Sequence, residues 1–305
     1  MSYKLTILGA NSATPAYGRH HTAQLLQFGR HHFLIDCGEA TQERLTLYKA
    51  NTWKIKHIFI SHLHGDHYLG LMGLIFTMHL MRRPHDLHIY GQRGLQEIIT
   101  LQLKYSDSRL NYKIVFHELD PNSPQVIFED DQVSVTSFPL NHRIPCCGFL
   151  FKEQPKPFRL NKEKLPATIS LQAIAQLKQG RDATDEQSGH TYLASELTLP
   201  PRKSLSYAFC SDTCYDESLT ELLKEVDLLY HEATFLKEKL PWAKQTFHST
   251  THEAGTIAKL CGAQKLLIGH YSARYKDLTP FLEETREVFP NTELALEGEC
   301  HEVTE

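Results

Sequence analysis

Ser61-His62-Leu63-His64-Gly65-Asp66-His67 places three imidazoles and one carboxylate within six consecutive positions, 62–67. It follows the short apolar run Ile58–Ile60, a pattern typical of a strand buried on both faces. Since residues i and i+2 of an extended chain point to the same side, His62 and His64 can share one metal ion. Gly65 permits a turn without steric penalty, so the aspartate and the histidine after it can address a second ion. The stretch therefore predicts a metal site at the carboxyl end of a buried strand.

Other ionisable side chains follow predicted strands further along the chain. These strands are expected at 133–138, 206–210, 227–230 and 265–268. The residues that follow them are, in the same order, His142, Asp212, the pair His231 and Glu232, and His270. A site at one edge of a sheet requires such groups at the carboxyl ends of its strands. A single histidine in such a position is more often structural, but the whole set supports one shared site.

Short apolar strands alternate with helical stretches over the whole chain. Further strands are expected at 5–8, 23–28, 32–35, 87–90, 113–119 and 293–296, and helices at 39–47, 70–81, 217–226, 253–260 and 279–288. Strands with interspersed helices predict a layered α/β sandwich. Its 305 residues are near the upper size of a single domain, so we expect one domain over 1–305.

The composition excludes several classes of protein. Hydrophobic residues make up 41% and charged residues 22%, which is ordinary for a soluble globular chain. No apolar run approaches the ~20 residues of a membrane span, and the first residues do not resemble a signal peptide. Seven cysteines without a CxxC pair exclude a dense disulfide framework and indicate a reducing, cytoplasmic location. The 19 histidines invite a search for metal ligands.

One segment differs in charge from the rest of the chain. Residues 152–181 carry seven basic and two acidic side chains, a net charge of +5, which leaves −9 on the remainder of a chain of net charge −4. Pro155, Pro157 and Pro166 prevent a long helix in its first half, and Gly180 ends a helical pattern in its second half. We expect an inserted arm at 152–201. On composition alone, a solvated charged face is a better explanation of this charge than RNA binding.

Several motifs together resemble the ribonuclease Z family of the metallo-β-lactamase superfamily. The HxHxDH loop at 62–67 is the mark of the superfamily, whereas His231-Glu232-Ala233-Thr234 and His248-Ser249-Thr250 resemble two motifs of the family. Gly269–Tyr275 resembles its last ligand motif, and Leu34–Gln42 resembles its early DCGEGTQ motif. The resemblance covers nearly the whole chain. It implies a four-layer αββα sandwich with an inserted arm, and an endonuclease that processes the 3′ ends of tRNA.

The resemblance also implies a set of metal ligands. It assigns His62, His64 and His142 to one zinc ion, Asp66, His67 and His270 to the other, and Asp212 to both. The residue types agree, because imidazoles favour zinc over magnesium or calcium, although manganese remains open. Two such ions would clamp the attacking and leaving oxygens of a phosphodiester. A metal-bound hydroxide would then attack phosphorus and leave a 3′-hydroxyl on the tRNA.

The remaining roles follow from the same resemblance. Asp66 would help to activate the water, and His248, oriented by Glu232, would act near the leaving oxygen. Arg274 and Lys178 would contact the substrate, and the arm would grip precursor tRNA. Simpler alternatives stay open: His248 as a helix cap, Arg274 as an ordinary surface residue, and the neighbouring His231 as a core histidine.

The chain departs from the family in two places. The Leu177-Lys178-Gln179-Gly180 segment is present, but no Pro-Pro-Gly-Pro stretch precedes it. His20 stands where the family has the Asn of an Arg-Asn pair.

From the resemblance as a whole we expect a zinc-dependent, homodimeric endoribonuclease acting on precursor tRNA, with no membrane association. The alternatives are a small-molecule phosphodiesterase or other hydrolase on the same scaffold, and an RNA-binding protein with an inactive metal site.

Overall fold

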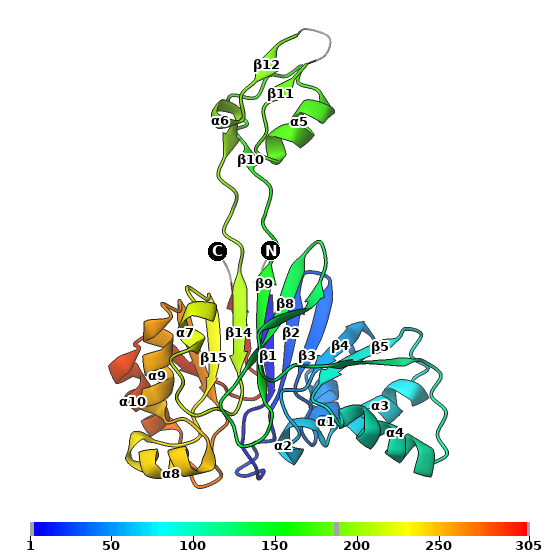
Figure 1. The fold of residues 1–305 in the computed structure, drawn as a ribbon, viewed down its shortest axis with the longest axis vertical. Helices are drawn as coiled ribbons and strands as arrows, with labels where there is room; N and C mark the ends of the chain where they lie inside the picture. The colour runs from blue at the N-terminus through cyan, green and yellow to red at the C-terminus, as the bar shows by residue number, and fades with distance from the viewer. Residues whose placement is uncertain (1–2, 186–188, 304–305) are drawn as a thin grey trace. The chain divides into compact units, whose positions relative to one another are not determined.

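A computed structural model describes residues 3–185 and 189–303 of the chain. The chain divides into two compact units. The body consists of the residues up to Lys152 together with those from Ser206 onward, and the arm consists of Glu153–Leu205. Each unit is described below by itself (Figure 1).

The first sheet of the body has seven strands. In spatial order they are β18 (Cys300–Val303), β1 (Tyr3–Gly9), β2 (Ala23–Phe28), β3 (His31–Ile35), β4 (Ile55–Phe59), β5 (Leu87–Gly91) and β6 (Ile114–Glu118). Strands β3 to β6 are parallel to one another, whereas β18, β1, β2 and β3 pair antiparallel. The metal-ligand loop 62–67 therefore leaves the carboxyl end of a central parallel strand.

The second sheet also has seven strands. They are β17 (Thr292–Leu294), β16 (Lys265–Gly269), β15 (Leu228–Glu232), β14 (Ser206–Cys210), β9 (Cys147–Glu153), β8 (Val133–Pro139) and β7 (Gln125–Glu129). Strands β14 to β17 are parallel, and β9 is antiparallel to β14. The carboxyl ends of β14, β15 and β16 thus lie at one edge of the sheet. β14 ends two residues before Asp212, β15 ends at Glu232, and β16 ends directly before His270.

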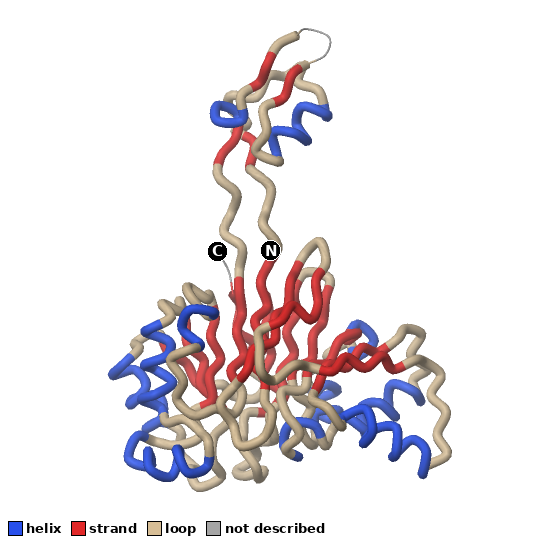
Figure 2. The backbone as a smooth tube through the Cα atoms, in the orientation of Figure 1, coloured by secondary structure: helices blue, strands red, loops and turns tan. Residues whose placement is uncertain are grey.

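Helices cover the outer faces of both sheets (Figures 1 and 2). The helices beside the first sheet are α1 (Thr41–Leu47), α2 (Gly65–Tyr68), α3 (Leu71–Leu80) and α4 (Leu95–Tyr105); those beside the second are α7 (Leu219–Leu222), α8 (Leu240–Thr246), α9 (Thr251–Leu260) and α10 (Thr279–Val288). Aliphatic side chains fill the space between the first sheet and its helices. Aromatic rings join the sheets: Phe59 lies 5.4 Å from Phe149 and 5.5 Å from Phe151.

These layers confirm the predicted αββα sandwich. The predicted helix 217–226 is wrong in extent, because only Leu219–Leu222 is helical and Glu225 takes a left-handed backbone conformation with φ of 56°. The sequence analysis also missed β7, β9, β18, α4 and α8. In the described residues, no helix has the length and apolar character needed to cross a membrane.

Gly65 does not act as predicted. It makes no left-handed turn and instead begins the short helix α2. The backbone N–H of His67 donates to the carbonyl of His64 at 3.0 Å, so helical winding places Asp66 and His67. A Cβ atom at Gly65 would lie 2.8 Å from Cδ1 of Leu69. No left-handed backbone requires the glycine here, and a larger residue would need only the half-exposed side chain of Leu69 to shift.

The arm has a small core of its own. It contains β10 (Arg159–Leu160) paired with β13 (Thr198–Leu199), β11 (Ala183–Thr184) paired with β12 (Thr191–Tyr192), and helices α5 (Leu171–Lys178) and α6 (Ala194–Leu197). Ser170 caps α5 by accepting a hydrogen bond from the backbone N–H of Ala173 at 3.1 Å. Residues 153–205 carry eight basic and six acidic side chains, a net charge of +2. The positive charge is concentrated in 156–181, which holds six of the eight basic residues.

Candidate metal centre and catalytic site

Three overlapping groups of possible metal ligands meet at the edge of the two sheets, and the third, Asp212, His248 and His270, shares one member with each of the other two. The first comprises His62, His64, His142 and Asp212. Nδ1 of His64 lies 2.9 Å from Nε2 of His62 and 3.1 Å from Nε2 of His142. The alternation of the extended backbone after β4 brings the first two together, and the loop after β8 supplies the third.

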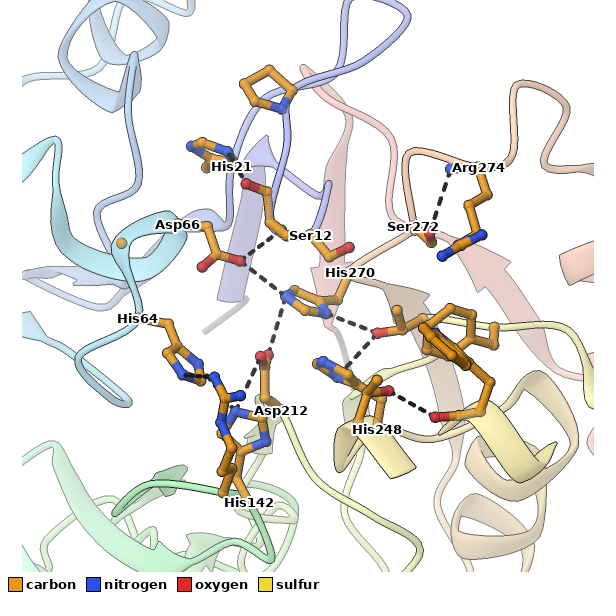
Figure 3. A pocket seen from close by; sticks show the side chains of 18 of the residues that line it. Ser12, His21, His64, Asp66, His142, Asp212, His248, His270, Ser272 and Arg274 are labelled. Atoms are coloured by element: carbon orange, nitrogen blue, oxygen red, sulfur yellow. Dashed lines mark hydrogen bonds and ion pairs between the residues drawn. The ribbon is translucent and has the colours of Figure 1, made fainter. Parts of the chain in front are cut away.

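The second group comprises Asp66, His67 and His270. Nε2 of His67 lies 3.4 Å from Oδ2 of Asp66, and Nε2 of His270 lies 3.5 Å from the same oxygen. His270 follows β16 and has a left-handed backbone, with φ of 62°. This strained backbone position directs its ring toward Asp66 (Figure 3).

Asp212 faces both groups, one oxygen to each. Its Oδ2 lies 3.6 Å from Nε2 of His62 and 3.8 Å from Nε2 of His142. Its Oδ1 lies 3.4 Å from Nε2 of His67 and 3.1 Å from Nε2 of His270. A carboxylate in this position could offer one oxygen to a metal ion in each group.

The hydrogen-bond partners show that the donor set fits metal ions. Nδ1–H of His142 donates to the carbonyl of Phe247 at 2.9 Å, so its Nε2 presents a lone pair. Nε2 of His67, Nε2 of His270 and Oδ1 of Asp212 are buried and make no hydrogen bond within the described residues. Lone pairs that face one another at such distances repel unless a cation lies among them. Nitrogen and carboxylate donors in this proportion suit zinc and similar divalent ions.

Buried groups outside the ligand set fix the ring orientations. Asp36, which follows β3 with φ of 53°, accepts a hydrogen bond from Nδ1 of His67 at 2.7 Å. The Asp36 carboxylate also accepts hydrogen bonds from the backbone N–H of Ser61 at 2.8 Å and from the Ser61 hydroxyl at 2.9 Å. The hydroxyl of Thr234 donates to Glu232 at 2.8 Å and so accepts from Nδ1 of His270 at 2.9 Å. Both ligand histidines therefore keep Nε2 free for a metal.

We expect Asp36→Asn to weaken metal binding in the second group by about 10- to 100-fold. The amide N–H₂ would face Nδ1–H of His67, and this clash favours the tautomer whose proton sits on Nε2, the metal-facing nitrogen. Competition with a chelator measures the affinity. Asp107→Asn, on an exposed turn, is the matched control and should bind metal as the wild type does. Unchanged affinity in Asp36→Asn would contradict the role of Asp36.

His248 and Glu232 form an acid–base pair beside the ligands. Glu232 is fully buried and accepts from Nδ1 of His248 at 2.8 Å and from backbone N–H groups of Thr213, Thr234 and Ser249. Burial alone would lower the pKa of His248, but the carboxylate of Glu232 outweighs it and raises that pKa to about 9. His248 is therefore a cation at neutral pH and can donate a proton.

The helix cap that was an alternative role for His248 belongs to another residue. Thr250 caps α9, and its side chain and that of Glu253 form a reciprocal capping box. His231 makes a different contact from its neighbour: it is buried, and its Nδ1 lies 2.7 Å from the carbonyl of Glu232. Since side chains alternate along β15, Glu232 reaches the site whereas His231 does not belong to either ligand group.

The other predicted residues lie in different places. Arg274 is exposed and lines the same pocket as the ligands, with its guanidinium carbon 5.5 Å from the ring centre of Trp242. Lys178 is exposed on α5 of the arm. His20 is held by Glu297, with Nδ1 2.9 Å from the carboxylate. Asp36 and Thr234 were missed as functional residues, although Asp36 obeys the rule of an ionisable group directly after a strand.

A pocket of about 820 Å³ opens over the ligands. Figure 3 shows its labelled side chains converging from both sheets. Its lining includes Ser12, Glu39, Arg143, Phe235 and Trp242 beside the metal ligands. The pocket can admit a phosphodiester together with its neighbouring groups.

Two sheets between layers of helices, with His and Asp ligands on the loops at their shared edge, define the metallo-β-lactamase fold. YhfI from Bacillus subtilis, a solved metallo-β-lactamase fold protein, superposes with a TM-score of 0.70 at 20% identity, covering 99% of each chain. Ribonuclease Z from Cytophaga hutchinsonii is 49% identical over 305 residues, which are 100% of this chain and 97% of that protein. The chain belongs to the ribonuclease Z family, and its residues 3–159 also match the family model described as Anti-Pycsar protein Apyc1. The solved short form of human tRNase Z is 27% identical, with a TM-score of 0.73 over 99% of this chain and 100% of that one.

Proposed function

We propose that this chain is the metal-dependent endoribonuclease that removes 3′ trailers from precursor tRNA. The observation that carries the proposal is the pairing of His248 with Glu232 beside the bridged ligand groups, at 2.8 Å, in a chain 49% identical to a ribonuclease Z. A proton donor is what cleavage to a 3′-hydroxyl requires, because the leaving oxygen of the tRNA must be protonated.

Two zinc ions are the proposed cofactors, with manganese as an alternative. His62, His64 and His142 would hold one ion, Asp66, His67 and His270 the other, and Asp212 both. Bound divalent ions lower the pKa of a water and neutralise charge on a phosphodiester. Burial favours the neutral form of Asp66, but His67 and His270 outweigh it and hold the pKa of that carboxyl well below its usual range. Asp66 therefore stays ionised and can orient the attacking water.

The chain's own groups then complete the reaction. The carboxylate of Glu232 keeps His248 protonated and fixes its ring through Nδ1, which leaves Nε2–H free to donate. That proton passes to the 3′ oxygen of the tRNA as the bond to phosphorus breaks. Arg274, exposed in the pocket, is placed to attract the phosphate backbone.

We expect His248→Ala to slow cleavage of precursor RNA by about 10²- to 10⁴-fold. The same variant should lose much less activity on bis(p-nitrophenyl) phosphate, because p-nitrophenolate leaves without being protonated. Steady-state rates on both substrates measure the difference, and metal content checks that the centre is intact. Equal losses on the two substrates would contradict a general-acid role for His248.

The arm and the oligomeric state complete the proposal. The basic residues within 156–181 of the arm, with Lys178 among them, would contact phosphates of the tRNA at a distance from the cut. A homodimer in which each arm serves the partner's site is part of the proposal. All seven cysteines are free, which suits a reducing cytoplasm.

The direct test is to map the products from a 3′-extended tRNA precursor. The proposal predicts a single cut that leaves a 3′-hydroxyl. Hydrolysis of small phosphodiesters without any cut in the precursor would favour the alternative, a small-molecule phosphodiesterase.

A further inference from the structure

Trp242 is an exposed indole in the pocket over the metal ligands. It lies on α8, near the start of the helix, and 43% of its surface is exposed. Among the residues that the structure describes, no aromatic ring stacks on it, and its one close ring contact is the guanidinium of Arg274 at 5.5 Å. Single exposed apolar residues are ordinary on a protein surface, so the observation that matters is the place of this indole in the pocket over the candidate ligands, where it can stack on a ring of a bound molecule.

The neighbouring charges favour a nucleic acid as that ligand. Arg274 forms no ion pair with a described carboxylate, so its charge is available to a phosphate. Arg143 enters the same pocket, 3.2 Å from Nε2 of His64. An aromatic face beside unpaired guanidinium groups is the combination that holds single-stranded RNA, since the ring stacks a base while the cation holds the backbone.

We propose that Trp242 stacks the base of the nucleotide that carries the leaving 3′ oxygen, and that Arg274 holds the adjacent phosphate. This inference rests on the proposed function. We infer the side of the cut from the fact that Trp242 and His248 line the same pocket and belong to one segment: the backbone N–H of His248 donates at 2.9 Å to the carbonyl of Ala243, the residue after Trp242. The base beside the proton donor belongs to the nucleotide that receives the proton. Trp242 is thus a specificity-determining residue for the unpaired base at the mature 3′ end.

The test combines protein variants with an abasic substrate. Trp242→Ala should raise KM for a 3′-extended acceptor-stem RNA by about 5- to 150-fold, and Trp242→Phe should restore most of the loss. An abasic nucleotide directly before the cut should raise the wild-type KM by a similar factor. In Trp242→Ala the abasic change should add less than about 3-fold, because the stacking partner is already absent. Additive losses would overturn the proposal.

Fluorescence separates this inference from the proposed function. The chain has two tryptophans, and Trp53 lies on a short 3₁₀ turn (Thr52–Lys54) that lines a different pocket. In Trp53→Phe, the remaining indole should be quenched by the intact RNA and not by the abasic one. Quenching without cleavage would refute the proposed function and keep the stacking site, whereas cleavage without quenching would refute the stacking site. Trp53→Ala is the matched control and should cleave with the wild-type KM.

Discussion

Asp212→Ala should lower cleavage by at least about a thousandfold, because its carboxylate faces both ligand groups and the proposed pair of ions would supply several kcal/mol of transition-state stabilisation. Oδ1 and Oδ2 of Asp212 face different groups, at distances of 3.1–3.8 Å from four imidazole nitrogens. Metal analysis of the purified variant should find fewer bound ions than in the wild type. The variant would also lack the negative charge of the Asp212 carboxylate, which would offset the positive charge of metal ions bound in the proposed centre.

Two variants separate this effect from a general loss of stability. His64→Ala removes one ligand from the first group alone, so it should lose one ion and keep the other. Asp216→Ala removes a nearby partly exposed carboxylate that belongs to neither group and should leave both activity and metal content unchanged. If Asp212→Ala binds as much metal as the wild type and cleaves within tenfold of it, the bridging role is wrong.

Deletion of the arm should nearly abolish cleavage of precursor tRNA while a small phosphodiester is still hydrolysed. Lys152 of β9 lies opposite Ser206 of β14 in an antiparallel pair, so Asn-Gly can replace residues 153–205 as a two-residue hairpin turn. We expect KM for precursor tRNA to rise by at least about 100-fold, since phosphate contacts dominate the affinity for nucleic acids. The slope of log affinity against log salt should fall by about one for each phosphate contact that is lost.

Neutralising lysine side chains of the arm tests the same docking role without deleting the arm. Changing Lys162, Lys164 and Lys178 to glutamine removes three exposed charges outside the small core of the arm. The affinity for tRNA and its salt dependence should fall together, and the rate on bis(p-nitrophenyl) phosphate should not change. An equal loss on both substrates after deletion of the arm would contradict a docking role.

The fold, and the clustering of the candidate ligand residues at one sheet edge, could be predicted because their signals are local. The strand β4 runs into the continuous apolar stretch Ile58–Ile60, and each candidate metal ligand stands within a few residues of a predicted strand. The alternation along β15 separates His231 from Glu232 by simple periodicity, so that only one of them could reach the site.

The missed features depend on contacts that are distant in sequence. β9 mixes buried aromatic residues with Lys152, and it is a strand because β14 pairs with it after an insertion of more than fifty residues. Asp36 is functional through its contact with His67, 31 positions later. The net charge of +5 that the sequence analysis found for 152–181 does not extend over the whole arm. Acidic residues after Arg181 reduce the net charge of 153–205 to +2.

The most direct test of the central claim is to map the ends that the purified, metal-loaded protein produces from a 3′-extended tRNA precursor. Single-nucleotide mapping should show one cut directly after the unpaired base that follows the acceptor stem, with a 3′-hydroxyl on the tRNA and a 5′-phosphate on the trailer. No cut in the precursor, together with rapid hydrolysis of bis(p-nitrophenyl) phosphate, would contradict the claim and assign the centre to a small substrate.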